Sequence, residues 1–204
     1  IKERSYLTLT ANISRNKNRL DKLSDAMKVY NESQMAAAAE NTNSSPVQMY
    51  YDGVSMDAIW GMKSLGIDPR NGREIYLTKD GTPTYTYSGG EQVVLGDEMP
   101  KFQGTAGLSF EWKGIGGNLS FIFQYGAQMY NETLINKVEN ADLNQNVDIR
   151  LYDGVWRPGD EGQVKPYKQL GEVWISETQE YEQLKTNPTS RFVQDRNELT
   201  LSNL

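Results

Sequence analysis

The sequence contains no cysteine and no histidine in 204 residues. Without cysteine, the chain has neither a disulfide framework nor a thiolate metal site. Without histidine, it lacks Ser–His and Cys–His nucleophile pairs and imidazole metal ligands. We therefore expect a chain that is not an enzyme, with no catalytic, metal-binding or cofactor-binding residues.

Long apolar runs and a basic stripe are also missing. No apolar run approaches the roughly 18 residues of a membrane-spanning helix. The chain starts at Ile1 without an apolar signal region, so we expect it to be a piece of a longer protein. Its net charge is −6, and its lysines and arginines are scattered, which predicts no nucleic-acid partner.

Aromatic and turn-forming residues are plentiful instead. Hydrophobic residues make up only 37% of the chain, yet it contains 12 Tyr, 4 Trp and 18 Gly. Its mean hydropathy is −0.67. A few strands joined by long polar loops would give this balance.

The clearest pattern is a period of two on both sides of a Gly-rich turn, in residues 104–126. It predicts strands at 104–112 and 117–126, joined by a four-residue loop that sets Trp112 opposite Gly117. In this register one face of the hairpin is apolar and the other is polar, apart from Ile122. A soluble β-sandwich and an outer-membrane barrel both fit this hairpin, and strands of 9 to 10 residues would rise about 25 Å in a tilted barrel.

In the barrel interpretation, the apolar side chains face lipid and the polar ones face the lumen. The lipid-facing residues would be Leu108, Phe110, Leu119, Phe121 and Phe123, and the lumen-facing residues Ser109, Glu111, Ser120 and Gln124.

Other segments carry local signals. Alternation predicts strands at about 4–15 and 191–204. Helical spacing from Leu20 predicts an amphipathic helix over 19–40, with a partner-binding helix as the alternative. Residues 67–74 predict a turn in which Asn71-Gly72 supplies left-handed positions, and 74–87 a hairpin closed by a type I′ turn at Asp80-Gly81.

The remaining segments, 16–101 and 127–190, are predicted to be long loops. Compact soluble domains seldom contain connections of this length. The order of long loop, tight turn and long loop is typical of outer-membrane barrels, with short periplasmic turns and long outer loops. The fold class we predict is mainly β, an antiparallel piece of a transmembrane barrel.

Five stretches resemble the carboxy-terminal barrel region of SusC/RagA-type TonB-dependent transporters of Bacteroidetes. They are SLGIDPRNGREIYLTKDG (64–81), VVLGDEMPKFQGTAGLSFEWKG (93–114), YNETLINKVEN (130–140), RLYDGVWRPGD (150–160) and TSRFVQD (189–195). They follow the family's order with similar spacing. The family's amino-terminal plug and TonB box match nothing in the chain.

The resemblance implies a fragment of a 22-stranded barrel in the bacterial outer membrane that imports glycans or peptides. It also implies a SusD-like surface lipoprotein as partner, and energy from TonB through a region outside this chain. The turn near Lys113 would face the periplasm, and the two long segments would be extracellular. The alternative function is a soluble β-rich carbohydrate-binding module.

Candidate ligand-binding residues are the aromatics of the long loops, because flat π surfaces pack against sugar rings. Aromatic side chains also pack against one another when a long loop folds on itself. Asp160-Glu161, or Asp68 with Glu74, could form a glycosidase pair, but their spacing in sequence does not favour it. Residues 68–74 lack the ligand pattern of a calcium loop. The candidate aromatics are Tyr50, Tyr51, Trp60, Tyr85, Tyr87, Trp156 and Trp174.

Overall fold

The computed structural model describes residues 5–40, 44–142, 144–175 and 178–203. Within them the chain is mainly β and antiparallel, and these residues do not form a closed barrel. The strands are β1 Tyr6–Ser14, β2 Ala58–Gly61, β3 Lys63–Ile67, β4 Glu74–Leu77, β5 Pro83–Thr84, β6 Val93–Asp97, β7 Phe102–Trp112, β8 Ile115–Tyr130, β9 Glu172–Ile175, β10 Glu180–Gln183 and β11 Val193–Asn203. The helices are α1 Asp25–Glu40, η1 Gly89–Glu91, α2 Glu132–Leu134, the π-helical η2 Ile135–Glu139, α3 Arg150–Gly154 and η3 Ser190–Phe192.

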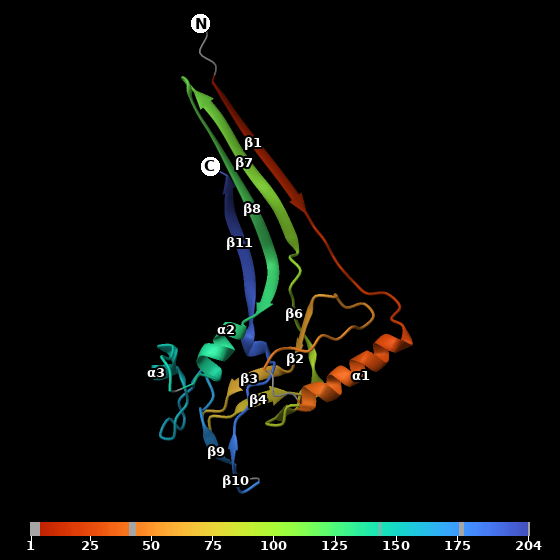
Figure 1. The fold of residues 1–204 in the computed structure, drawn as a ribbon, viewed down its shortest axis with the longest axis vertical. Coiled ribbons are helices and arrows are strands. Elements are labelled where there is room, and N and C mark those ends of the chain that lie inside the picture. The colour runs from red at the N-terminus through yellow and green to blue at the C-terminus, as the bar shows by residue number, and fades with distance from the viewer. Residues whose placement is uncertain (1–4, 41–43, 143, 176–177, 204) are drawn as a thin grey trace.

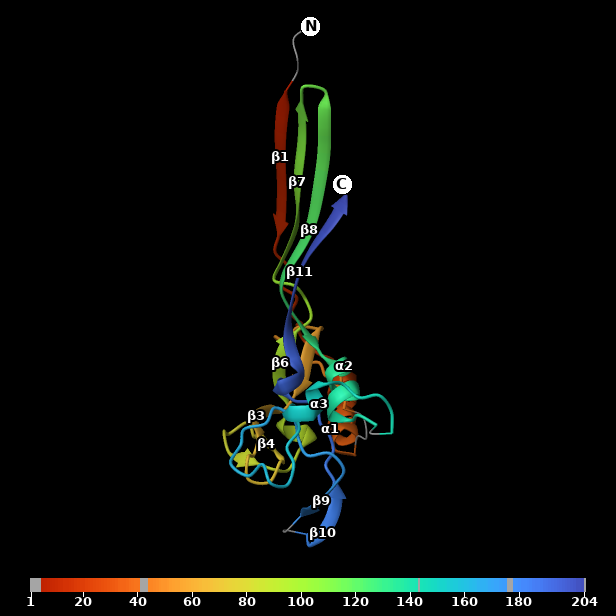
Figure 2. The same cartoon turned by 90° about the vertical axis from the view of Figure 1, so that its left-hand side faces the viewer.

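The molecule has two parts (Figure 1). Four long strands form one sheet in the order β1-β7-β8-β11, which we call the long sheet. The described residues of the segments 15–101 and 131–192 fold together beyond one end of it, and we call this part the loop body. Figure 2 shows the four strands side by side and the β9–β10 hairpin at the far end of the loop body.

The long sheet has one continuous apolar face. Leu9 lies opposite Leu108, and Leu108 opposite Leu119, so apolar side chains meet across three strands. Leu199 of β11 pairs with Phe123 and continues the same face. Nothing covers this face among the described residues, and Leu9 is 73% exposed.

The hairpin at the centre of the sheet turns more tightly than predicted. Trp112 pairs with Ile115, not with Gly117, because Lys113 and Gly114 alone form the turn with φ of 50° and 82°. Two successive positive φ values give a type I′ turn, whose twist matches that of the strands. The register therefore differs by two residues from the prediction, and an even shift keeps every side chain on its predicted face.

The two predicted long loops contain most of the short elements. Residues 16–101 carry α1 and β2 to β6, and residues 127–190 carry α2, η2, α3, β9 and β10. Their apolar side chains form two clusters inside the loop body, one around Phe192 and Val138 and another around Met49 and Trp60. The predicted hairpin at 74–87 is present as β4 paired with β5. The other short strands were missed because their burial comes from long-range packing and not from a local period.

Three local predictions are corrected. Helix α1 begins at Asp25, because Leu20 and Leu23 donate their backbone amides to Val54 O (2.9 Å) and Asp52 Oδ1 (2.7 Å) instead of entering the helix. At Asp80-Gly81 only the glycine has a positive φ, so the turn is not type I′. At 71–72 only Gly72 is left-handed.

Candidate functional site

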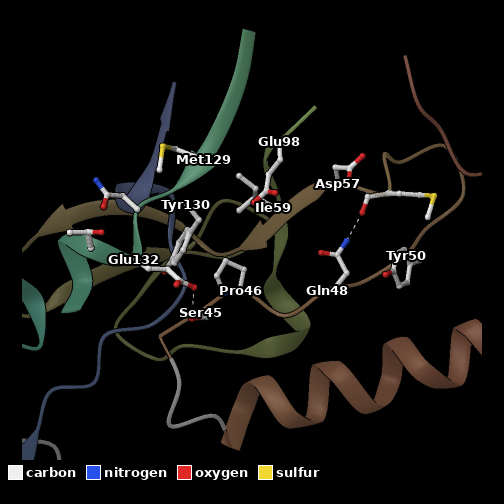
Figure 3. A pocket seen from close by; sticks show the side chains of 14 residues that line it. Ser45, Pro46, Gln48, Tyr50, Asp57, Ile59, Glu98, Met129, Tyr130 and Glu132 are labelled. Carbon is white, nitrogen blue, oxygen red and sulfur yellow. Dashed lines mark hydrogen bonds between the residues drawn. The ribbon is translucent and has the colours of Figure 1, made fainter. Parts of the chain in front are cut away.

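A large pocket lies where the loop body meets the long sheet (Figure 3). We call it the junction pocket; its volume is about 740 Å³. It is lined by Ser45, Pro46, Gln48, Tyr50, Met56, Asp57, Ala58, Ile59, Glu98, Met129, Tyr130, Asn131, Glu132 and Thr133. The end of β8 supplies one wall and the segment leading into β2 another, so the pocket depends on the contact between the two parts.

Hydrogen bonds hold the walls in place. Tyr130 Oη donates to Ser44 O over 2.7 Å, and Ser45 Oγ donates to Glu132 Oε1 over 2.8 Å. The amide Nε2 of Gln48 donates to Met56 O over 2.6 Å. These bonds join residues 44–48 to the segments after β8 and before β2, which fixes the shape of the pocket without a ligand.

The charge of the junction pocket has one sign. Asp57, Glu98 and Glu132 are among its lining residues, and no lysine or arginine is. Clefts lined by one sign of charge raise the local concentration of oppositely charged ligands. Pro46, Ile59 and Met129 add apolar surface. This arrangement suits a cationic or neutral polar ligand with apolar parts, and it disfavours an anionic one.

A buried ionic cluster lies inside the loop body. Arg191 Nε lies 2.9 Å from Glu74 Oε1, and one of its terminal nitrogens lies 2.9 Å from Glu139 Oε1. Lys168 Nζ donates to Glu139 O over 3.2 Å. Burial raises the pKa of Glu139, which is 0% exposed, and lowers the pKa of Lys168. Because Arg191 precedes β11 by only two residues, the cluster ties the loop body to the long sheet.

The other carboxylates considered for catalysis also have structural partners. Asp68 is buried and accepts hydrogen bonds from Arg70 and Tyr85; those from Arg70 are the main reason that its pKa is well below the usual range. Asp160 lies 3.8 Å from Lys165 and accepts from the Arg157 amide. Glu74 belongs to the buried cluster.

The structure separates the seven predicted aromatics into packing and accessible groups. Trp156 is buried and donates its indole N–H to Pro69 O over 3.1 Å. Trp60 is buried with its ring centroid 5.1 Å from that of Tyr51. Tyr87 is half-buried against Tyr76, and burial raises its pKa to about 12. For Trp60 and Trp156 the observed role is packing of the loop body.

The remaining candidates keep some access to solvent. Tyr50 lines the junction pocket. Tyr85 is half-buried, with the Arg73 guanidinium 4.4 Å from its ring centroid. Tyr51 is exposed at the edge of its contact with Trp60. Trp174 is 52% exposed on β9 and forms an edge-to-face pair with Tyr181 at 5.1 Å, far from the pocket. Their contact with a ligand stays a prediction.

Sequence reasoning missed most of the pocket. Asp57, Glu98 and Glu132 come from three separate segments, and no spacing in the sequence links them. Among the described residues, no group of three or more acidic side chains is arranged to hold a metal ion. In the same part of the chain, no helix combines the length and apolarity needed to cross a bilayer.

Comparison with solved structures shows which known fold this chain shares. "Structure of the RagAB peptide transporter" matches with a TM-score of 0.69 and 16% identity over 98% of this chain. The RagAB peptide importer matches in its "open-open" and "closed-closed" states, both with a TM-score of 0.65 and 17% identity, over 97% and 98% of this chain. No family model and no curated protein matches the sequence.

The matches cover nearly all of this chain but only part of each matched chain. The chain spans 19 to 20% of the length of the matched RagAB chains. At 16 to 17% identity the likeness shows a shared fold. The long sheet and the loop body together therefore have the fold of one part of a RagAB chain.

Proposed function

We propose that this chain is a segment of a SusC/RagA-type importer in the bacterial outer membrane. In this proposal the long sheet is part of the wall of a 22-stranded barrel, and the loop body lies at its outer side. The chain has no enzymatic role and contributes to transport. The observation that carries the proposal is the uncovered apolar face of the long sheet, together with a fold match that extends across both parts.

The dimensions of the apolar face support a membrane location. Its outward row runs along β7 from Trp112 to Phe102, a strand of 11 residues that rises about 25 Å at a strand tilt of about 40°. Aromatic side chains stand at both ends: Trp112 is 60% exposed, and Tyr125, opposite Phe102, is also 60% exposed. An apolar band of this height between two aromatic girdles is typical of outer-membrane strands and is a poor surface for a soluble module.

The junction pocket suggests the class of substrate. It opens beside the end of β8, where a lumen-facing wall would meet the outer loops. The matched proteins are described as peptide transporters or importers, and the three carboxylates of this pocket favour cationic or neutral chains. We therefore propose peptides with basic residues as the first choice of substrate. Glycans are the second choice, and acidic polymers are the least suitable.

The partners in this proposal follow the RagA/RagB type of complex. A SusD-like surface lipoprotein would bind at the outer side, and TonB would act through a region outside this chain. The loop body offers the surface for the first contact, because it projects beyond the long sheet (Figure 1).

The test measures uptake of a fluorescent basic peptide by cells that carry the intact protein. Asp57→Asn, Glu98→Gln and Glu132→Gln are combined in one variant. Uptake at subsaturating peptide should fall about ten-fold, equivalent to about 1.4 kcal/mol of binding free energy. Uptake should also stop when the proton gradient is collapsed.

A matched variant removes three exposed carboxylates elsewhere: Asp153→Asn, Glu172→Gln and Glu180→Gln. It should import the peptide at the parent rate. Equal loss in both variants would contradict a role for the pocket, and gradient-independent uptake would contradict import of this type.

A further inference from the structure

A second pocket lies beside the end of the edge strand β1, next to the junction pocket, with which it shares Ala58, and it is basic. We call it the basic pocket; its volume is about 380 Å³. It forms where the chain leaves β1 after Ser14 and where it enters β7 before Phe102. It is lined by Arg15, Asn16, Lys17, Asn18, Arg19, Gly53, Val54, Ser55, Ala58, Val94, Asp97, Met99 and Lys101.

The charges of the basic pocket are not neutralised. Four cations line it, and none forms an ion pair with another residue in the described ranges. The single lining carboxylate, Asp97, accepts from Ser55 Oγ at 3.2 Å and from Met99 N at 3.0 Å. Four lining cations against one occupied carboxylate favour the binding of an anion.

Two of the cations are positioned by contacts with the long sheet. The Arg15 guanidinium lies 5.7 Å from the centroid of the Phe102 ring. The stem of Lys101 packs across Gly126, where a Cβ would come within 3.0 Å of Lys101 Cδ. Because glycine has no Cβ, residue 126 leaves room for the lysine stem. Glycine also tolerates the φ of +78° at this position.

The position of the basic pocket along the strands identifies its ligand. Arg15 follows Ile13 in the apolar row of β1, one step beyond the last aliphatic side chain. Phe102 and Tyr125 stand at the same level as an aromatic girdle. Aromatic rings of this kind mark the headgroup level of a bilayer, and basic side chains beyond them reach the lipid phosphates. Val54, Val94 and Met99 give the pocket an apolar side.

We propose that the basic pocket binds the phosphate-bearing headgroup of a lipid in the outward-facing leaflet. The guanidinium groups of Arg15 and Arg19 supply paired donors for phosphate oxygens, and Lys17 supplies a point charge. The apolar side of the pocket contacts the carbon atoms next to the phosphate. This inference rests on the proposed membrane location of the long sheet.

The test compares two triple variants of the intact protein, purified in neutral detergent. The first is Arg15→Gln, Lys17→Gln and Arg19→Gln. The second, a matched control, is Lys63→Gln, Lys137→Gln and Lys185→Gln, which removes the same charge from exposed positions away from the pocket. The probes are dioleoyl phosphatidic acid, dioleoylglycerol and inorganic phosphate, and native mass spectrometry measures the bound fraction.

The parent and the control should bind phosphatidic acid in preference to dioleoylglycerol. Each basic residue near a lipid surface strengthens binding about five-fold, so the first variant should lose at least ten-fold in affinity. Equal affinity of the two variants would overturn the proposal. Inorganic phosphate that competes as well as the lipid would also overturn it, because the site would then be one for a free anion.

Fractionation of the cells separates this inference from the proposed function. If the parent is in the outer-membrane fraction and does not bind phosphatidic acid, only the lipid site is refuted. If the parent is absent from that fraction, the membrane location itself is refuted, whatever the lipid measurement gives.

Discussion

Replacing Arg191 with methionine should loosen the loop body, because the change leaves two buried carboxylates without their main counter-charge. Arg191 contacts Glu74 at 2.9 and 3.1 Å and Glu139 at 2.9 Å, and all three side chains are largely buried. Breaking a buried pair by removing one partner costs about 3 to 5 kcal/mol. Lys168 stays beside Glu139, so we expect the lower half of this range.

The assay is hydrogen exchange of loop-body amides in the purified intact protein. A loss of about 3 kcal/mol should speed exchange through local opening more than a hundred-fold around η2 and η3. Glu139→Gln should have a much smaller effect on exchange. Burial, which raises the pKa of this carboxyl, already disfavours its charged form, and Arg191 retains its ion pair with Glu74 in this variant.

Arg150→Met is the matched control, because Arg150 forms a partly exposed pair with Asp148 at 2.7 Å. Exposed pairs contribute about 0 to 1 kcal/mol. If Arg191→Met and Arg150→Met speed exchange equally, the buried cluster does not stabilise the loop body and the reasoning fails.

Four further outcomes are expected. Phe121→Arg should cost about 2 to 4 kcal/mol in a detergent-folding assay and Ser120→Arg much less, and equal damage would contradict a one-sided sheet. Gly72→Ala should destabilise the loop body by about 2 to 4 kcal/mol, seen as a lower melting temperature, because its φ is +68° and a Cβ would lie 2.4 Å from Trp156 Cε3. The pKa of Asp68 is lowered in the folded chain, so its carboxylate stabilises the loop body at pH values above the unfolded-state pKa near 3.8. This stabilisation should fade as the pH falls below that value. An acid titration of the Asp68→Asn variant should lack this loss of stability. The 204 residues alone should need detergent or form oligomers, and a cooperatively melting monomer in plain buffer, measured by light scattering, would favour the soluble-module alternative.

The face of the long sheet could be predicted because a strand's period of two is a local property. Leu108 and Phe121 share a face in any register that differs by an even number of residues, so the error at the turn did not change the assignment. The exact register could not be predicted. The sequence Lys113-Gly114-Ile115-Gly116 allows two turn lengths, and the twist of the strands selects the shorter one.

The pockets could not be predicted in the same way. Asp57, Glu98 and Glu132 meet only because β2 and β6 pair and the end of β8 packs beside them. The prediction from aromatics selected Tyr50, which the structure places in the lining of the junction pocket, and it also selected Trp60 and Trp156, whose side chains are buried in the loop body. An aromatic residue in a long loop serves packing or binding, and only its exposure distinguishes them.

The most direct test of the membrane location uses cysteines introduced one at a time, since the chain contributes no thiol of its own. Leu108→Cys and Ser109→Cys are neighbours on opposite faces of β7 and are labelled with a fluorophore in reconstituted membranes. At position 108 the label should be quenched by a lipid-soluble quencher and protected from iodide, and at position 109 the reverse should hold. Equal quenching by iodide at both positions would contradict the placement of this sheet in a bilayer.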